Sequence, residues 1–391
     1  MEEKSRVVKV MELRNVYISH TGCVTPLGFN VQENAQAVAN GVSGIGLQHN
    51  NLMQQPFYAA VIDNVKLDAA FAAISNGKRY TRLEKMVLLA MHPVLKSAGV
   101  PLNEKSVFIL STTKGNIATL QKQENPPSQA YLQNFAKTIA DYFGFQTEPI
   151  VVSNACVSGI MAVSIAKRLI ETGLYDHVFV AGADEVSKFV LSGFNSFQAM
   201  SDVPCKPYSA NRKGITLGEG AAAAFVTFDS KKANARIAGD SSINDANHIS
   251  GPSRTGEGLV KSIENAFRES GIGSKQIDYI SAHGTATPFN DEMEAIAFNR
   301  TGLDEVPLNS FKGYYGHTLG ASGLLETVIG LESMKQNRIF ESLGYEEPGV
   351  SQSINVITEN SDKEINYFLK TASGFGGCNT AVVFEKVVNG R

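Results

Sequence analysis

Apolar residues along the chain follow two kinds of spacing. Short runs rich in valine, isoleucine and phenylalanine alternate with longer segments in which apolar residues recur at helical spacing. The first pattern predicts buried strands and the second predicts amphipathic helices. In the first half of the chain, strands are expected at 15–19, 106–111, 150–152, 177–183 and 221–228. Helices are expected at 31–40, 77–98, 129–143, 157–170 and 193–200.

The same alternation continues in the second half. Strands are expected at 235–243, 278–282, 306–310, 366–371 and 380–387, and helices at 256–270, 291–299 and 322–335. Strands that alternate with helices predict an α/β fold with largely parallel sheets. We interpret the chain as two similar halves that meet near Ser230, spanning 1–230 and 231–391. Three polar or glycine-rich stretches are interpreted as loops or irregular segments: 20–28, 50–76 and 205–220.

Composition and charge argue against several classes of protein. The net charge of −3 is not that of a nucleic-acid-binding protein. No apolar run approaches the length of about 18 residues typical of a transmembrane helix, and the charged N-terminal segment lacks the apolar core of an export signal. The four cysteines lie far apart without a Cys-x-x-Cys pair, which fits neither a disulfide framework nor a zinc site. We expect a cytoplasmic protein with no metal site and no membrane segment.

One cysteine stands where a strand runs into a helix. Cys156 follows the apolar run 150–152, and apolar residues at helical spacing begin soon after it. At a helix N-terminus, unpaired N–H groups and the helix dipole favour the thiolate. A dipole contribution of ~1 kcal/mol lowers a cysteine pKa by about 0.7 unit. An inert, buried cysteine at a tight turn fits this stretch equally well, so the partners of Cys156 must decide between the two interpretations.

Two histidines follow apolar strands in the second half. His283 comes directly after the strand at 278–282, while Lys312 and His317 follow the strand at 306–310. In open α/β sheets, ligands bind at the carboxyl ends of strands, where these side chains are expected. Each histidine taken singly is more often structural than catalytic. Together with a thiol that can hold an acyl group, imidazoles that can donate to an oxyanion make a set suited to acyl transfer.

A series of motifs lies in one order along nearly the whole chain. They are Asn154-Ala-Cys156, Leu217-Gly-Glu-Gly-Ala221, His283-Gly-Thr-Ala-Thr-Pro288, Gly320-Ala-Ser-Gly323 and Gly374-Phe-Gly-Gly377. With these motifs the chain resembles the elongating β-ketoacyl-[acyl carrier protein] synthases of the thiolase-like superfamily. The resemblance implies a thiolase-like α/β fold, in which two pseudo-repeated βαβαβ halves form a five-layer αβαβα sandwich. The first half would carry Cys156, and the second would carry His283, Lys312 and His317.

The reaction of that family implies a role for each of these side chains. Cys156 would take an acyl chain from the phosphopantetheine arm of an acyl carrier protein. Malonyl-acyl carrier protein would then lose CO2, and its enolate would attack the thioester to give a 3-oxoacyl-acyl carrier protein. His283 and His317 would stabilise the enolate oxygen, and Lys312 would orient His317. No bound cofactor is implied, because the substrates arrive on phosphopantetheine.

The resemblance also implies a set of supporting residues. Glu326 would support Lys312, with Asp291 and Glu294 in the neighbouring motif. The backbone amides of Cys156 and Phe375 would form an oxyanion hole, and Phe375 would act as a gate beside mobile glycines. Thr285 and Thr287 would bind the pantetheine arm. The mobile glycines would be Gly374, Gly376 and Gly377.

Three departures from the family pattern bear on the pathway. The usual Arg-Pro-Phe-Asp is Lys206-Pro-Tyr-Ser209 here, Lys312 is followed by Gly-Tyr-Tyr, and the segment 340–359 lacks the usual proline-rich pattern. Within fatty acid or polyketide synthesis, we therefore expect a specialised acyl chain such as a polyene. The alternative is a non-elongating, chain-length-type partner subunit of a heterodimeric synthase. Such subunits lack the active-site cysteine that this chain retains, which favours the enzyme.

Carrier proteins of this family are acidic, which implies a basic docking surface. The candidates form one basic stretch, and a solvated helix face explains the same residues equally well. The resemblance also implies a homodimer, with a heterodimer of homologous subunits possible. The candidate docking residues are Lys78, Arg79, Arg82 and Lys85.

Overall fold

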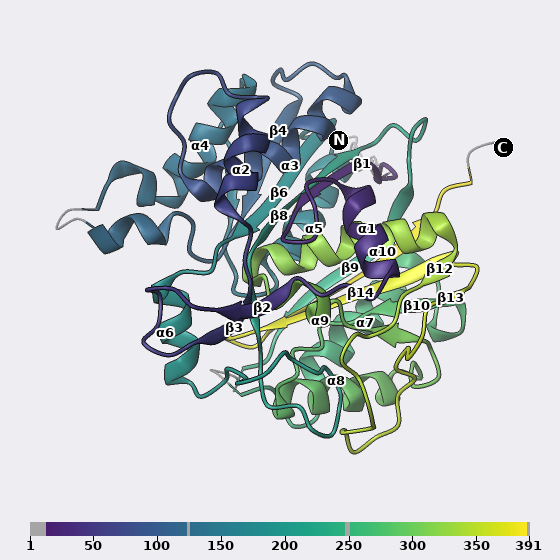
Figure 1. Ribbon diagram of the computed structural model, residues 1–391. Coiled ribbons are helices and arrows are strands. Elements are labelled where there is room, and N and C mark those ends of the chain that lie inside the picture. Colours follow the sequence, from purple (N-terminus) through teal and green to yellow (C-terminus); the bar gives the residue numbers. More distant parts are fainter. Residues whose placement is uncertain (1–12, 123–125, 247–250, 389–391) are drawn as a thin grey trace, which may run out of the picture.

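Ten strands in the computed structural model join in the order β11-β10-β14-β15-β9-β1-β8-β6-β4-β5 (Figure 1). The structure describes residues 13–122, 126–246 and 251–388. The strands fall into two groups of five, because β9 and β1 share only the pairs Tyr17–Arg236 and Ile18–Ala235. The first group is β1 (Tyr17–Val24), β4 (Ser106–Ser111), β5 (Ile150–Val152), β6 (His177–Asp184) and β8 (Gly220–Thr227). The second is β9 (Ala235–Asn244), β10 (Tyr279–Ser281), β11 (Leu308–Asn309), β14 (Tyr367–Gly374) and β15 (Cys378–Lys386).

The two groups repeat one topology. When the five strands of a group are numbered in chain order, both groups lie in the spatial order third, second, fourth, fifth, first. The fifth strand, β8 or β15, runs antiparallel to both of its neighbours. The second strand, β4 or β10, runs parallel to both of its neighbours. Four strands of each group therefore point the same way, which agrees with the expected, largely parallel sheets.

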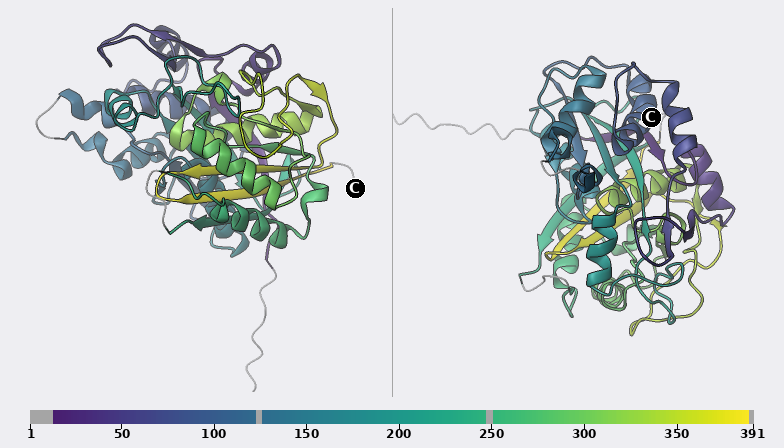
Figure 2. Two further views of the ribbon diagram at one scale, coloured as in Figure 1. Left: turned by 90° about the horizontal axis from the view of Figure 1, so that it is seen from below. Right: turned by 60° about the vertical axis from the view of Figure 1, so that its left-hand side comes forward.

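Helices separate the two groups of strands and cover their outer faces (Figure 2). Helix α5 (Ser158–Glu171) contacts strands of both groups, and α10 (Ser322–Gln336) packs on both β8 and β14. On the outer faces, α3 (Arg82–Ala98) covers β1 and β8, while α7 (Glu257–Ser270) covers β9 and β15. Helix α4 (Leu132–Phe143) lies against α3, and α8 (Pro288–Arg300) lies against α7. The layers therefore follow the order helix, sheet, helix, sheet, helix.

The two central helices cross with their backbones in contact. A methyl group added to Gly159 of α5 would lie 2.7 Å from the amide nitrogen of Leu324. One added to Gly323 of α10 would lie 2.7 Å from the amide nitrogen of Ile160. Glycine is therefore required on both sides of the crossing. Because each crossing point lies in the first turn of its helix, the segments that precede α5 and α10 are brought close together.

Smaller elements connect and cover these layers. Strands β2 (Ile45–Gln48), β3 (Phe57–Ala60) and β7 (Leu217–Gly218) form a separate sheet, and β12 (Arg338–Ile339) pairs with β13 (Ser361–Asp362). The shorter α-helices are α1 (Val31–Ala39), α2 (Asn64–Ala72), α6 (Lys188–Ser196) and α9 (Lys312–Tyr315). The 3-10 helices are η1 (Ile117–Lys122), η2 (Ser128–Ala130), η3 (Ser274–Gln276) and η4 (Leu319–Ala321). Within the described ranges, no helix is both long and apolar enough to span a membrane.

The interpretation of 20–28 as a loop is wrong for its first part. Strand β1 continues through Val24, because this segment pairs with the row of alanines in β8. Gly22 is part of the sheet, where it allows close packing rather than a turn. A methyl group on Gly22 would lie 2.2 Å from the carbonyl oxygen of Ala90 in α3.

Two other expectations are also corrected. The helix expected at 193–200 is α6, which spans Lys188–Ser196 and begins earlier because the Ser187 hydroxyl caps it by accepting from the Val190 N–H (3.3 Å). The segment 50–76, expected to be irregular, contains β3 and α2. Helix α2 is capped by Asp63, whose side chain accepts from the Lys66 N–H (2.9 Å).

We predict that Gly159→Ala destabilises the protein, because the added methyl group would push α10 away from α5. Overpacking of this kind costs about 1–3 kcal/mol of unfolding free energy. Gly193→Ala is the control, because Gly193 lies in α6 and an added methyl group there meets no atom within 4 Å. Urea denaturation should show a lower unfolding free energy for Gly159→Ala only. Equal stability of Gly159→Ala and the wild type would contradict a close crossing.

Candidate active site

Cys156 sits on a sharp turn between β5 and α5. Ala155 has a φ of 43°, in the left-handed region that residues with a Cβ rarely adopt. Two hydrogen bonds close the turn: the Asn154 N–H donates to Ser158 Oγ (2.8 Å), and the Ser158 hydroxyl donates to the Ala155 carbonyl (2.6 Å). The side chain of Cys156 is only 7% exposed, yet it lines a cavity.

The Cys156 thiol is protonated at neutral pH. Burial is the main cause and raises its pKa to about 12; Cys378 and Asp184 act in the same direction, and Lys312 acts against them. This corrects the expectation of a lowered pKa. The helix dipole is worth ~1 kcal/mol, which is less than the cost of removing a thiolate from water. A reaction at this sulfur therefore needs a proton acceptor beside it.

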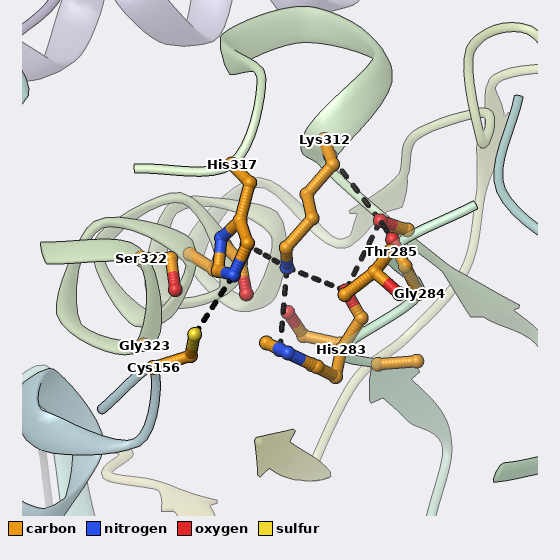
Figure 3. Close-up of polar contacts among 12 residues, drawn as sticks. Cys156, His283, Gly284, Thr285, Lys312, His317, Ser322 and Gly323 are labelled. Carbon is orange, nitrogen blue, oxygen red and sulfur yellow. Dashed lines mark hydrogen bonds and ion pairs between the residues drawn. The ribbon is translucent and has the colours of Figure 1, made fainter. Parts of the chain in front are cut away.

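His317 is within hydrogen-bond distance of that sulfur. Its Nε2 atom lies 3.0 Å from Cys156 Sγ (Figure 3). The His317 backbone is held in place, since its N–H donates to the Thr216 carbonyl (2.7 Å). Burial, followed by the charges of Lys312 and Lys370, holds the His317 pKa well below its usual value. The imidazole is therefore neutral and able to exchange a proton with the thiol.

His283 faces the same cavity from the end of β10. Its ring lies 5.3 Å from the His317 ring between centroids, with the ring planes at 81°. The Nζ atom of Lys312 lies 3.3 Å from His283 Nδ1. An ammonium group only donates, so Nδ1 is the acceptor and the proton of the neutral ring is on Nε2. Burial, and then the charge of Lys312, lowers the His283 pKa well below its usual value.

Lys312 contacts a different histidine from the one that the resemblance implies. The resemblance assigns it to the orientation of His317, whereas its ammonium group lies against His283 (Figure 3). The topology explains this difference. Lys312 follows β11 and His283 follows β10, and these two strands are parallel neighbours. Their carboxyl ends therefore place the two side chains side by side.

The sequence interpretation missed a second buried lysine. Lys370 lies within β14 and is 0% exposed, and its Nζ is 2.6 Å from Oε2 of Glu326. The other carboxylate oxygen of Glu326 lies 2.7 Å from Nζ of Lys312. Glu326 on α10 therefore joins two lysines in one buried ion cluster. The available signal was a lysine, the one charged residue of β14, directly after the apolar residues at its start.

Two carboxylates of α8 hold the backbone around His283. Glu294 accepts from the N–H groups of His283 (2.8 Å) and Gly284 (2.7 Å), and Asp291 accepts from the N–H of Thr285 (3.0 Å). The hydroxyl of Tyr208 also donates to Glu294 (3.0 Å). Tyr208, one of the departures from the family pattern, was not expected to take part in this network.

A cavity of about 410 Å³ lies above Cys156. Phe375 lies on its wall, stacked on Phe194 at 5.7 Å and in edge contact with Phe197 at 5.5 Å between ring centroids. Phe194 belongs to α6 and Phe197 follows directly after it. Sequence interpretation identified Phe375 but missed these two partners, because no local pattern links α6 to the turn after β14. Thr285 and Thr287 also line the cavity.

Glycines place the Phe375 segment against Cys156. A methyl group on Gly374 would lie 3.0 Å from the amide nitrogen of Cys156, so the chain passes close over that amide. Gly376 and Gly377 have φ values of 87° and 84°, which favour glycine.

The hydroxyl oxygens of Thr285 and Thr287 lie 2.9 Å apart on the cavity wall.

The four candidate docking residues differ in their surroundings. Lys78 and Arg79 are exposed, and Lys85 forms an ion pair with Asp68 (2.7 Å). The guanidinium group of Arg82 is engaged in contacts within the protein. It donates to the Ile62 carbonyl (2.7 Å) and to Asn64 (2.7 Å), and it pairs with the buried Glu219. Of the four, Lys78 and Arg79 have side chains directed to solvent.

We predict that alkylation of Cys156 by iodoacetamide keeps accelerating between about pH 7 and pH 10, roughly tenfold per unit, because only the thiolate reacts. Intact mass measured over time gives the rate. The Cys156→Ala variant corrects for alkylation of the other buried cysteines, Cys23, Cys205 and Cys378. A plateau near the free-cysteine pKa of about 8.5 would contradict a raised pKa.

Comparison with known proteins matches two consecutive parts of the chain to one family. Residues 13–232 match the family described as "Beta-ketoacyl synthase, N-terminal domain", and residues 234–346 match "Beta-ketoacyl synthase, C-terminal domain". The "3-oxoacyl-[acyl-carrier-protein] synthase 2" of Vibrio cholerae is 26% identical, over 96% of this chain and 100% of that protein. The protein of the same name from Coxiella burnetii is 28% identical, with coverage of 96% and 100%.

A solved structure shows the same fold. It is described as a ketosynthase in complex with its chain length factor, from Xenorhabdus doucetiae, and the matched chain has a TM-score of 0.83 at 25% identity. The match covers 96% of this chain and 98% of that chain. The layered arrangement is thus the thiolase-like fold of ketosynthases, as the resemblance implies. The chain belongs to the beta-ketoacyl synthase family.

Proposed function

We propose that this protein catalyses the decarboxylative condensation of an acyl chain, held on Cys156, with malonyl-acyl carrier protein. The products are a 3-oxoacyl-acyl carrier protein and CO2. One observation carries this proposal: at one cavity, a thiol lies 3.0 Å from the neutral imidazole of His317, whose ring faces the second neutral imidazole, that of His283. A thiol stores an acyl group, and two imidazoles can donate to a developing enolate oxygen.

In the first half-reaction, the sulfur of Cys156 attacks the thioester of the incoming acyl-acyl carrier protein. The thiol proton passes to the departing pantetheine thiolate, and His317 is close enough to the sulfur to carry it. The backbone amides of Cys156 and Phe375 would stabilise the oxyanion of the tetrahedral intermediate, and the close approach of Gly374 to the Cys156 amide supports that role. Phe375 would open as the acyl chain enters, turning on the glycines that flank it.

In the second half-reaction, malonyl-acyl carrier protein enters the same cavity. Its thioester carbonyl would accept hydrogen bonds from His283 Nε2 and from His317, and the loss of CO2 leaves the enolate oxygen between these donors. The enolate carbon then attacks the Cys156 thioester and expels the thiolate, which takes up one proton. Thr285 and Thr287, on the cavity wall, would bind the pantetheine arm.

The supporting residues act through the imidazoles. Lys312 would hold His283 in the tautomer that presents Nε2–H to the cavity, and Glu326 would hold Lys312. Asp291 and Glu294 would fix the backbone on both sides of His283. No step needs a metal or a bound cofactor, since the carried phosphopantetheine brings both substrates. The reaction would take place in the cytoplasm, where thiols stay reduced.

We propose that the two halves, 1–230 and 231–391, divide the chemistry between them. The first supplies the nucleophile, and the second supplies both imidazoles and the lysine. The repeated strand order of the two groups supports this division. The phenylalanines on the cavity wall suit a flat, unsaturated acyl chain, in line with the expected polyene or polyketide substrate.

The proposed assembly is a homodimer or a heterodimer of homologous subunits. Strand β5 ends the ten-strand order with β4 as its one neighbour in the described residues, so its other edge is available for pairing with a second subunit. The Xenorhabdus ketosynthase, solved in complex with its chain length factor, supports a heterodimer. The contact between Cys156 and His317 argues against this chain being the non-elongating subunit.

We predict that incubation with acyl-acyl carrier proteins adds an acyl group to Cys156, seen as an increase in intact mass. Cys156→Ala should show no adduct. His283→Ala should still form the acyl-enzyme but lose malonyl decarboxylation by about 10²–10³-fold, because it removes one oxyanion donor. The absence of an adduct with every donor in a panel of saturated and unsaturated chains would contradict the proposal. A preference for ordinary saturated chains would contradict the specialised substrate.

We predict that the double variant Lys78→Glu/Arg79→Glu raises the KM for acyl-acyl carrier protein by about tenfold, because two exposed charges would repel an acidic partner. Turnover of a small pantetheine thioester should not change. The matched control is Lys231→Glu/Lys232→Glu, another exposed and adjacent basic pair. Equal KM values for the two double variants would place the docking surface elsewhere.

A further inference from the structure

Lys370 is a buried cation for which neither the family reaction nor the cavity provides a use. It is 0% exposed and does not line the cavity above Cys156. Its ammonium group lies 2.6 Å from Glu326, 3.1 Å from the carbonyl of Ser281 and 3.3 Å from the carbonyl of Ala282. All three partners are acceptors, which favours the ammonium form. Burial lowers the pKa of Lys370 below its usual value, and the carboxylate of Glu326 acts against that effect. Burying a charge is costly, so a buried lysine in a strand calls for a specific role.

The contacts of Lys370 converge on His283 by two routes. Ser281 and Ala282 are the two residues directly before His283, so Lys370 fixes the backbone from which that imidazole projects. Through Glu326, Lys370 also fixes Lys312, whose Nζ lies 3.3 Å from His283 Nδ1. Both routes end on the same ring.

The charges of this cluster do not balance. Two ammonium groups share the single carboxylate of Glu326, so these three groups together carry one net positive charge. Glu294 is a further carboxylate beside them, and it accepts from the backbone N–H of His283 (2.8 Å). A positive charge at this place disfavours a second one on either ring. The proposed condensation requires both rings to be neutral donors.

We propose that Lys370 is a positioning residue for the condensation: it holds Glu326, Lys312 and the backbone of His283 in place, and its charge adds to burial and to the charge of Lys312 in keeping both imidazoles neutral. This inference rests on the proposed function, because neutral donors matter only for an enolate oxygen. Lys312 contacts His283 directly, and Lys370 fixes the position of Lys312 through Glu326.

The pKa directions of the two imidazoles support this role. Burial is the largest cause of the lowered pKa of His283 and His317, and the charges of Lys312 and Lys370 lower both further. Removing the charge of Lys370 should therefore raise both pKa values. The rings would then become protonated, and inactive as donors to the enolate, at a higher pH than in the wild type. The charged groups around His283 and Lys370 are Lys312 on α9, Asp291 and Glu294 on α8, and Glu326 on α10. Burial raises the pKa of Asp291 to about 7.

The test compares Lys370→Met, which removes the charge at similar length, with Lys370→Arg, which retains it. The matched control is Lys167→Met. Lys167 is another buried lysine in an ion cluster, with Asp240, Glu171 and Glu269. Its charge is not among the causes that shift the pKa of His283 or His317. Lys370→Gln, which keeps N–H donors for the carbonyls, replaces Lys370→Met if the latter does not fold.

Two readouts are measured on each variant. Histidine NMR titration of the unliganded protein reports the imidazole pKa values without any substrate. We expect the pKa of His283 or His317 to rise by about one unit in Lys370→Met and to stay in place in Lys370→Arg and Lys167→Met. The pH profile of malonyl-acyl carrier protein decarboxylation should show its acid limb displaced upward by the same amount, with kcat about tenfold lower and acylation of Cys156 unchanged.

The outcomes separate this inference from the proposed function. Unchanged imidazole pKa values in the uncharged Lys370 variants would overturn the inference, because a merely structural lysine would lower stability without moving them. A shift of the same size in Lys167→Met would overturn it too, since the effect would then be general destabilisation. If the pKa values move as expected while the wild type neither acylates Cys156 nor decarboxylates malonyl-acyl carrier protein, the inference about charge stands and the proposed function fails.

Discussion

The close crossing of α5 and α10 is the constraint on which the site depends. Two glycines, Gly159 and Gly323, let the helix backbones touch within the first turn of each helix. The turn with Cys156 precedes one helix and the segment with His317 precedes the other, so the crossing sets the distance of 3.0 Å between Sγ and Nε2. Asp184 adds a second tie, because it accepts from the N–H groups of Gly320 (2.7 Å) and Thr113 (2.9 Å) and so joins the two halves beside the crossing.

Burial sets the protonation states at this junction. It raises the pKa of the Cys156 thiol and lowers the pKa of both imidazoles, so every group that would exchange or donate a proton is uncharged at neutral pH. The charge of the site resides instead in the cluster of Lys312, Glu326 and Lys370, one layer behind the cavity wall. Fixed charges behind neutral donors form a preorganised environment, which is what the enolate of the proposed condensation requires.

The duplicated topology explains why the chemistry collects at one place. Cys156 follows β5 and Lys312 follows β11, and these two strands are the matching end strands of the two groups. His283 follows β10, the neighbour of β11. Strands β10 and β11 are parallel neighbours, so His283 and Lys312 emerge together. In the proposed reaction, the first half contributes the turn with the nucleophile, and the second contributes the imidazoles and the lysine.

The sequence by itself determined most of the elements and the candidate side chains, because apolar periodicity reflects local burial and because glycine-rich turns and strand ends have local signatures. It located the turn at Cys156 and the strand ends at His283 and Lys312, and its motifs indicated the family. Long-range packing decided the rest. The direction of the Cys156 pKa depends on burial by residues from both halves, and the contact of Lys312 with His283 rather than His317 depends on which strands are neighbours. Likewise, Arg82 forms an ion pair with Glu219, and Lys370 forms one with Glu326. These residues lie far apart in the chain, so only the tertiary structure could show that they are paired.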